Sequence, residues 1–420
     1  MDDIQEQLAQ LRRRIARINV KYKAGTPSTS PAEPLPTDLR PAHYFADEIL
    51  SGEVVETPLG AHFETERLYE RHRRHGSVDL SDLCELPEDL LEAVAGEAIR
   101  DSPPTRWAFL DTETTGLAGG AGTVAFLVGV GRICADGFRV RQFFMRDYGE
   151  EPSMLTALTR HLEGFEVLVT YNGKTYDGTL LETRYRMARS LPPLGRLSHV
   201  DLLHGARRLW KLRFESCRLI DLESQILGVE REGDLPGELI PYVYFEYVRK
   251  KQAAKLVPIF HHNAMDILTL ACLTAIVPWA FRSPEEAPLR HGAEWLGLAR
   301  WLLRAEREEQ GLRLLRRSIE AGLPDAHLFR TMWDIAMLEK KRRNEAGSLG
   351  VLADLAACRN PYRVPALEEL AKYYEHRERN YVLALEWTRQ ALTYQDSDTL
   401  RKREARLQER LSRPRPRRLL

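Results

Sequence analysis

An apolar run in the first third of the chain ends in two carboxylates. The segment AFLDTETTGL (108–117) passes from apolar residues to Asp111 and Glu113, with Thr112 between them. Side chains alternate along a strand, so Asp111 and Glu113 point to the same side, together with Phe109. Like charges at that spacing repel, and a hard divalent cation is the simplest way to neutralise them. The alternative is a strand end with two solvated acids, because short motifs often arise by chance.

A second acidic segment follows an apolar, strand-like run. YNGKTYD (171–177) ends that run and begins a helix, which places Asp177 near the helix start. Asn172 lies five residues before it, in the connecting turn. We expect this turn at the edge of the sheet beside the strand of Asp111.

A third segment, HHNAMDILTL (261–270), begins an apolar helix and carries Asp266 in its first turns. His262 precedes Asp266 by four residues, so the two share one helix face. His261 is five residues away and needs a non-helical start to converge on the same place.

Four carboxylates and a histidine predict a site for phosphoryl transfer. A dense acidic cluster costs several kcal/mol unless cations fill it. Two Mg²⁺ or Mn²⁺ ions about 4 Å apart would fill it and clamp an in-line displacement at phosphorus. Carboxylate ligands suit these hard cations and argue against zinc. The histidine can take a proton from the attacking water.

The runs around these residues predict the elements that position them. RWAFLD, TVAFLVGVGRI and FRVRQFFMRD are strand-like and joined by Gly-rich turns, which indicates an antiparallel three-strand meander. A helix at Ser153–Leu162 and a fourth strand, EVLVTYNG, then indicate a parallel return after a crossover. Residues 106–282 therefore predict an α/β ribonuclease-H-like domain of meander, parallel strands and flanking helices.

Other segments surround this domain. Apolar residues at alternating spacings of four and three predict an N-terminal amphipathic helix at 1–23, which docks on its own protein or forms a short coiled coil. Residues 24–42 are rich in Pro, Ser and Thr and predict a linker. Residues 43–105 mix short apolar pieces with charge and predict an irregular N-terminal layer.

The chain after the α/β domain is helical in pattern. GLRLLRRSI (311–319), AGSLGVLAD (346–354) and ALEWTRQAL (384–392) form a loose repeat within 284–396. This resembles tetratricopeptide helix pairs, and a plain helical bundle is the alternative. Residues 397–420 predict a basic tail, with nine Lys or Arg against two Glu in the last 20 residues. Such a tail is either a solvated end or a contact for polyanions.

Composition narrows the function classes. Lys plus Arg and Asp plus Glu both count 61, so any contact with nucleic acid must rest on local patches. The five cysteines are scattered without a CxxC pair, so they suggest neither a zinc ribbon nor a dithiol redox site, and they fit a reducing cytosol. The acidic N-terminal residues are not expected to be a secretory signal, and the apolar stretch Ile267–Phe281 is expected to be too short to span a membrane. We expect a cytoplasmic protein with no membrane contact.

The motifs in combination resemble a known superfamily. FLDTETTG, NGKTYD and HNAMD are similar to the three exonuclease motifs of the DEDD superfamily, the DnaQ-like 3′→5′ exonucleases with a ribonuclease-H fold. The order of FLDTETTGL, AGGAGTVAFLVGVG, VDLLHGARRLWK, SCRLIDLE, GDLPGELIP and HNAMDIL resembles the YprB-type ribonuclease-H-like proteins, which also carry tetratricopeptide-like repeats. The resemblance covers most of residues 50–400 and says little about the substrate.

The resemblance implies a role for each acidic residue. Asp111 would bridge two Mg²⁺ or Mn²⁺ ions, Glu113 and Asp266 would bind the catalytic ion, and Asp177 would support the second. A histidine would be the general base.

Two spacings compete for that histidine. The histidine subclass of the superfamily spaces its base five residues before the last Asp, which points to His261. The tyrosine subclass uses a spacing of four, which points to His262. We favour His262, because HN replaces YN and helix geometry aligns it with Asp266.

Contacts with nucleic acid are expected from three segments. The resemblance places Thr115, Gly116 and Leu117 against the terminal nucleotide. The helix in HVDLLHGARRLWKLR (199–213) turns its apolar residues to the core and its cations away, to bind phosphates or to face solvent. The further candidates are Asn172, Lys174, Arg207 and Arg208, with Lys211 and Arg213 on the same helical segment.

Two function classes remain open. The leading one is a metal-dependent 3′→5′ exonuclease acting on DNA or RNA, whose repeats bind a protein partner or the strand. The alternative is a weakly active or inactive adaptor that binds protein or nucleic-acid partners through its repeats and basic tail. The intact acidic set favours the enzyme, since an unfilled acidic cluster only destabilises a fold. A third possibility is an endonuclease or a strand-transfer enzyme on the same fold. It is less favoured, because such enzymes usually lack the His-x-x-x-Asp helix start found here.

Overall fold

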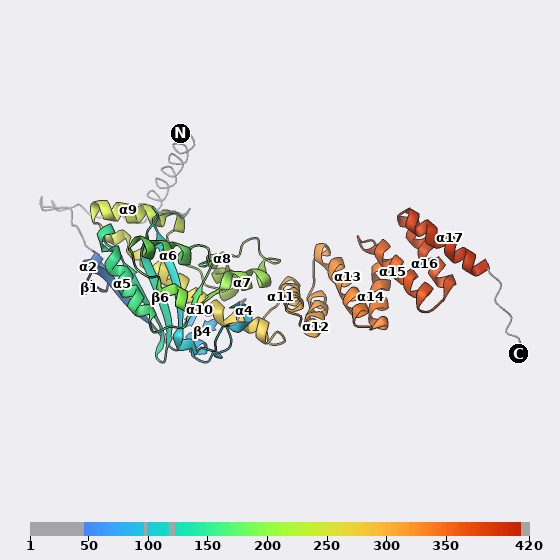
Figure 1. Ribbon diagram of the computed structural model, residues 1–420, viewed down its shortest axis with the longest axis horizontal. Coiled ribbons are helices and arrows are strands. Elements are labelled where there is room, and N and C mark those ends of the chain that lie inside the picture. The colour runs from blue at the N-terminus through green and yellow to red at the C-terminus, as the bar shows by residue number, and fades with distance from the viewer. Residues whose placement is uncertain (1–45, 96–98, 117–121, 413–420) are drawn as a thin grey trace, which may run out of the picture. The chain divides into compact units, whose positions relative to one another are not determined.

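The computed structural model describes residues 46–95, 99–116 and 122–412 (Figure 1). The helix predicted at 1–23, the linker predicted at 24–42 and Leu117 lie outside the described residues.

A seven-stranded mixed sheet organises the first part of the described chain, in the order β1-β2-β7-β6-β5-β8-β9. The first five strands in this order are antiparallel neighbours, whereas β8 runs parallel to β5 and β9 parallel to β8. The predicted meander and the parallel return strand are confirmed. The strands are β1 (Glu53–Thr57), β2 (Gly60–Glu70), β5 (Trp107–Thr114), β6 (Ala125–Cys134), β7 (Gly137–Phe144), β8 (Val167–Thr170) and β9 (Ser198–Asp201).

Residues 43–105 differ from the irregular layer that the sequence predicts. Strands β1 and β2 extend the sheet beyond β7, with Phe63 opposite Phe144 and Glu70 opposite Gly137. The remainder holds the short hairpin of β3 (Arg74–His75) and β4 (Val78–Asp79) with the helices α2 (Ala46–Ile49), α3 (Leu80–Cys84) and α4 (Glu92–Ala95). The charged residues of β2 made the strand hard to predict, because Glu64 is buried through side-chain pairs with His62 and Arg141.

Helices cover both faces of the sheet, and the alternation along β5 shows which residues each face buries. Ala108 and Leu110 join one apolar cluster, whereas Trp107 and Phe109 join the other. The first cluster includes residues of α5 (Glu151–Leu162), α6 (Asp177–Met187) and α9 (Ile240–Lys250). The second includes α7 (Leu202–Trp210) and α10 (Val257–Arg282). Asp111, two residues after Phe109, therefore lies on the α10 side.

Helix α10 is longer than its apolar stretch suggests. It begins at Val257, so both His261 and His262 lie inside it. Among the described residues, Ala253–Arg282 is the one helical segment long and apolar enough to cross a membrane, so the expectation that the apolar stretch is too short for this is wrong. However, 72% of its most apolar window is buried within the fold, as in the core helix of a soluble protein.

Glycines in β6 let α10 approach the sheet closely. A Cβ atom on Gly129 would lie 2.2 Å from Asn263 Oδ1 and 2.3 Å from Ile267 Cδ1. Gly129 is the register partner of Asp111 on β5. The close approach therefore occurs where the acidic site begins.

We expect Gly129→Ala to destabilise the fold by about 1–3 kcal/mol, the usual penalty of overpacking. The buried Asn263 amide cannot move aside without losing its hydrogen bonds to Asp111 and Gln142. Gly149→Ala is the matched control, because nothing lies within 4 Å of its added Cβ. Equal denaturation midpoints for the two variants would contradict the close packing.

The remaining described chain is helical, as predicted. The three repeat motifs fall in α12, α14 and α16, and each of these packs against the helix before it. The helices are α11 (Gly292–Arg304), α12 (Glu308–Glu320), α13 (Asp325–Lys341), α14 (Glu345–Ala357), α15 (Arg363–His376), α16 (Tyr381–Tyr394) and α17 (Asp398–Ser412).

Helix α17 changes the interpretation of the basic tail. Residues 398–412 form a helix that buries Leu400 and Leu407, while Arg403 and Arg406 pair with the buried Glu375 of α15. Part of the positive charge of this segment is therefore neutralised inside the fold. Residues 413–420 lie outside the described residues.

The predicted boundary at residue 284 does not coincide with a break in packing. Trp295 and Trp301 of α11 belong to the same apolar cluster as α7 and α10. Arg213 also forms an ion pair of 2.7 Å with Glu294, across that junction. A separate apolar cluster begins only in α13, at Ala336.

Candidate active site

Asp111 is held by a chain of buried amides. Asn263 of α10 donates a hydrogen bond of 2.8 Å from Nδ2 to Asp111 Oδ2. Its Oδ1 accepts a hydrogen bond of 2.9 Å from Gln142 Nε2 on β7. Because Asn263 and Gln142 are both buried, the orientation of the Asp111 carboxylate is fixed by three elements of the fold.

The four predicted carboxylates influence one another electrostatically. Burial raises the pKa of Asp111 well above its usual value, and the charges of Asp266 and Asp177 raise it further. Burial also raises the pKa of Glu113, and the charge of Asp111 is the next cause. Asp266 and Asp177 contribute to Glu113 as well. The four acids therefore lie close enough for the charge of one to raise the pKa of another.

Asp177 begins α6 and is reached from β5. The hydroxyl of Thr112, between the two β5 acids, donates a hydrogen bond to Asp177 Oδ1. The turn before it is fixed by Asp201, which accepts from the backbone N–H of Asn172 at 2.8 Å and of Lys174 at 3.1 Å. Asn172 adopts a left-handed conformation with a φ of 66°, which asparagine tolerates well. Burial raises the pKa of Asp177 to about 6.

This raised pKa predicts a stability change in the metal-free protein. The pKa of Asp177 rises from 3.8 to about 6 on folding, so its ionised form destabilises the native state above that pH. Asp177→Asn should therefore increase the free energy of unfolding by roughly 2–3 kcal/mol at neutral pH. The gain should shrink as pH falls through about 6 and vanish below 3.8.

Melting curves in EDTA across this pH range test the prediction. Asp101→Asn, an exposed acid without a described partner, is the control and should change little. If the stability gained by Asp177→Asn grew as the pH fell, the predicted direction of the pKa shift would be wrong.

Asp266 is paired with a residue that the sequence analysis did not single out. Arg231 Nη2 donates a hydrogen bond of 2.6 Å to Asp266 Oδ1. The same guanidinium, only 4% exposed, also pairs with Glu223 at 2.6 Å and with Asp234 at 3.4 Å. Arg231 therefore acts as an internal counter-ion of the acidic site.

His262 lies between two carboxylates. Its Nδ1 is 2.9 Å from Asp234 Oδ1, and its Nε2 is 3.6 Å from Asp266 Oδ2. Burial lowers the pKa of His262, but the hydrogen bond with Asp234 and the charges of Asp266 and Asp234 outweigh it, so the pKa is raised. His261, one position earlier on the same helix, is exposed and has no described contact with Asp266.

The donor set fits a hard divalent cation in type. Asp111, Glu113, Asp177 and Asp266 offer carboxylate oxygens alone, which suit Mg²⁺ or Mn²⁺. In the part of the chain that the structure describes, no group of three His, Cys, Asp or Glu side chains is arranged to hold a metal ion as it stands. Two of the four acids already have other partners, since Arg231 donates a hydrogen bond to one oxygen of Asp266 and Thr112 donates one to Asp177.

Thr115 and Gly116 close the end of β5. Thr115 exchanges two hydrogen bonds with Val124, through its backbone N–H at 2.9 Å and its hydroxyl at 3.0 Å. Gly116 accepts a hydrogen bond from Thr114 through its carbonyl. These contacts hold the end of β5 against the residue that precedes β6.

The predicted phosphate-binding residues do not all lie in one place. Asn172, Arg207 and Lys211 line one hollow of about 570 Å³ beside the turn that leads to Asp177. Arg208 instead lies over the ring of Trp301, 5.0 Å from its centroid, and contributes to the junction with α11. Lys174 is exposed in the same turn as Asn172.

Sequence reasoning missed Arg231 and Asp234, although Asp234 lies within GDLPGELIP. The available signal was an Arg three residues before an Asp, in a segment rich in Gly and Pro. Nothing in the sequence says that this loop folds against α10.

Comparison with known proteins places this site in a family. The RNase_H_2 family model, described as RNase_H superfamily, matches residues 108–277, a range that contains all four acids and both histidines. "Uncharacterized protein YprB" of Bacillus subtilis (strain 168) is 34% identical over 312 residues, covering 72% of this chain and 75% of that protein. These two similarities agree with the mixed sheet and with the acids at the end of β5. The chain therefore belongs to the RNase_H superfamily.

Proposed function

We propose that this protein is a 3′→5′ exonuclease that hydrolyses phosphodiester bonds of DNA or RNA with two Mg²⁺ or Mn²⁺ ions and a histidine base. Membership of the RNase_H superfamily suggests nuclease-type chemistry on nucleic acid, and nucleases of this fold generally use divalent metals. The observation that carries the finer proposal is the constellation around Asp111. Its carboxylate is fixed by Asn263, and the charges of Asp266 and Asp177 raise its pKa.

The side chains of the site divide the work. Asp111, Glu113, Asp177 and Asp266 would hold the ions, which supply charge stabilisation of the reacting phosphate when bound. His262 keeps its Nδ1 against Asp234, and its Nε2 is left to accept a proton from the attacking water. His261 would serve as base only if the start of α10 rearranged.

The strand leading to the site is proposed to pass over the hollow beside Asn172. Arg207 and Lys211 line it, and neither has a described ion-pair partner. They lie four residues apart and so share one face of their helical segment. Phosphate contacts there would be weakened by salt.

Further parts of the proposal rest on sequence patterns. The helix pairs beginning with α11 are proposed to be tetratricopeptide-like, because the repeated motifs occupy the second helix of each pair. The scattered free cysteines support a cytoplasmic location.

End-labelled single- and double-stranded DNA and RNA, incubated with Mn²⁺ or with EDTA, test the activity. The proposal expects stepwise shortening from the 3′ end in Mn²⁺ alone. Label at the 5′ end should then appear as a ladder, whereas label at the 3′ end should appear at once as mononucleotide. Internal fragments from the start would instead indicate an endonuclease.

A second candidate function, an inactive adaptor, is favoured by one observation. Arg231 already neutralises Asp266 in the structure. An adaptor would bind nucleic acid or protein without cleavage under every metal condition. Full binding with no shortened product in Mn²⁺ would support it over the nuclease.

A further inference from the structure

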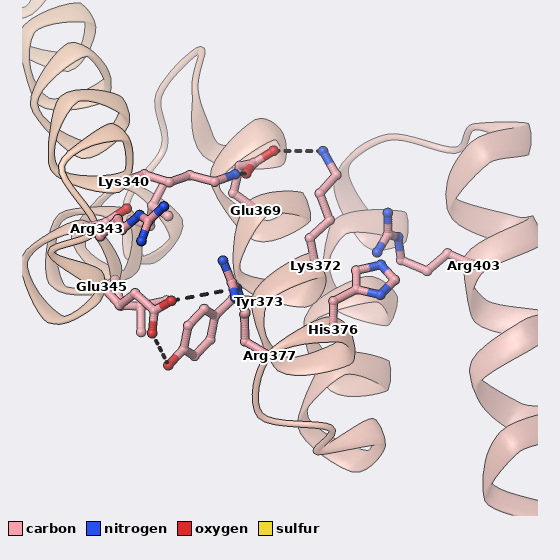
Figure 2. A pocket seen from close by; sticks show the side chains of 12 residues that line it. Lys340, Arg343, Glu345, Glu369, Lys372, Tyr373, His376, Arg377 and Arg403 are labelled. Carbon is pink, nitrogen blue, oxygen red and sulfur yellow. Dashed lines mark hydrogen bonds and ion pairs between the residues drawn. The ribbon is translucent and has the colours of Figure 1, made fainter.

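A hollow of about 520 Å³ lies among the C-terminal helices, in a part of the chain that the proposed chemistry does not use (Figure 2). Its wall combines residues from the end of α13, the start of α14, the second half of α15 and one side of α17. Leu349 and Leu352 of α14 give it an apolar floor. Residues from α13, α14, α15 and α17 therefore form one concave site.

The lining of this hollow carries a positive excess. Lys340, Arg343, Lys372, Arg377 and Arg403 outnumber Glu345 and Glu369, which leaves a formal excess of three positive charges. Most of these cations already have an internal partner. Lys340 and Lys372 both pair with Glu369, Arg377 lies 3.7 Å from Glu345, and Arg403 pairs with the buried Glu375.

Two polar groups in the hollow are left without a partner among the described residues. Arg343 takes part in no side-chain hydrogen bond or ion pair, and no dashed line reaches it in Figure 2. Ser348 is only 4% exposed, and its hydroxyl also has no described partner. The hydroxyl is not one of the buried polar atoms that lack a partner, so it is accessible and can donate a hydrogen bond to a ligand in the hollow.

We propose that this hollow is a docking site for an acidic segment of a partner polypeptide. A carboxylate of the partner pairs with Arg343 and accepts a hydrogen bond from Ser348. A neighbouring apolar side chain of the partner rests on Leu349 and Leu352. Arg suits this role because its planar guanidinium binds a carboxylate through two parallel hydrogen bonds.

The mixed lining favours a polypeptide over a nucleic acid. The backbone of a nucleic acid presents a row of phosphates and gains most from a row of unpaired cations. Here Arg343 is the one lining Lys or Arg without a partner among the described residues, and Glu345 would repel a phosphate. A polypeptide offers both carboxylates for Arg343 and N–H donors for the glutamates.

Fluorescence anisotropy with the full chain in EDTA tests the proposal. The probe is a short labelled peptide of alternating glutamate and leucine, with an alternating lysine and leucine peptide and a labelled oligonucleotide as the other arms. Saturable binding of the acidic peptide is expected. Arg343→Glu should weaken it by about tenfold or more, the effect of losing a charge-assisted pair, and Ser348→Ala by several-fold.

Arg359→Glu is the matched control, because Arg359 is also exposed to solvent, has no described partner and lies outside the hollow. Melting curves of each variant show that the fold is kept. The proposal is overturned if the acidic peptide does not bind, or if Arg359→Glu weakens it as much as Arg343→Glu does. It is also overturned if Arg343→Glu weakens the oligonucleotide instead, which would make a nucleic acid the occupant.

Discussion

Asp111→Asn should abolish metal-dependent cleavage and at the same time stabilise the metal-free protein. Both effects have one cause, because Asp111 is half-buried and lies close to the charges of Asp266 and Asp177. Removing its charge relieves that repulsion in EDTA, so the melting temperature should rise. The same change removes the charge of a predicted metal ligand, so the cleavage rate should fall by about 10³-fold or more, since several kcal/mol of charge stabilisation would be lost.

The opposed signs separate a catalytic effect from a folding defect. Asparagine keeps the shape of the side chain and can still accept the hydrogen bond from Asn263 Nδ2. Mn²⁺ should raise the melting temperature of the native protein by mass action and should raise that of Asp111→Asn much less. Asp101→Asn should leave cleavage and both melting temperatures unchanged. A variant that is both inactive and less stable in EDTA would show that Asp111 is a structural residue.

The sequence predicted the strands of the site because their signal is local. The alternation of apolar residues with short Gly-rich turns defines β5, β6 and β7, and the same alternation places Asp111 and Glu113 on one side of β5. The spacing of His262 and Asp266 likewise depends on helix geometry alone. These features need no knowledge of distant contacts.

The features that the sequence did not predict depend on partners far away in the chain. Glu64 is buried in β2 because Arg141, 77 residues later on β7, pairs with it and His62 bonds its other oxygen. Arg231 reaches Asp266 over 35 residues, from a loop without a regular pattern. The charge of each residue alone indicates a solvated surface, and only the tertiary pair makes burial possible.

The junction near residue 284 also depends on contacts between residues that are distant in the chain. The change to a purely helical pattern there predicts a domain boundary. The aromatic residues of α11 nevertheless complete the apolar core of α7 and α10, because Gly205 of α7 and Gly297 of α11 leave room for close contact. A Cβ on Gly297 would lie 2.4 Å from the carbonyl oxygen of Arg208, so the contact involves backbone and is invisible to a hydrophobic pattern.

His262→Ala should lower the rate of cleavage by about 10²–10⁴-fold, the usual contribution of a general base. His262 Nδ1 is fixed by Asp234, which leaves Nε2 on the side of Asp266, where the ion would bind. His261→Ala is the matched control on the next position of α10 and should cost far less, since its exposed side chain points about 100° away on a helix.

Asp234→Asn separates orientation from proton transfer. Asparagine can present its carbonyl or its amide to His262 Nδ1, so the ring loses the charge that holds it in one tautomer. The rate should fall by about tenfold or more, because partners of this kind typically contribute 10–100-fold. The Mn²⁺-dependent rise in melting temperature should persist in His262→Ala and in Asp234→Asn, since neither removes a predicted ligand. Single-turnover assays at saturating Mn²⁺ measure these rates. If His261→Ala instead proves the more damaging of the two histidine changes, the five-residue spacing holds, and α10 must unwind before Asn263 when the ions bind.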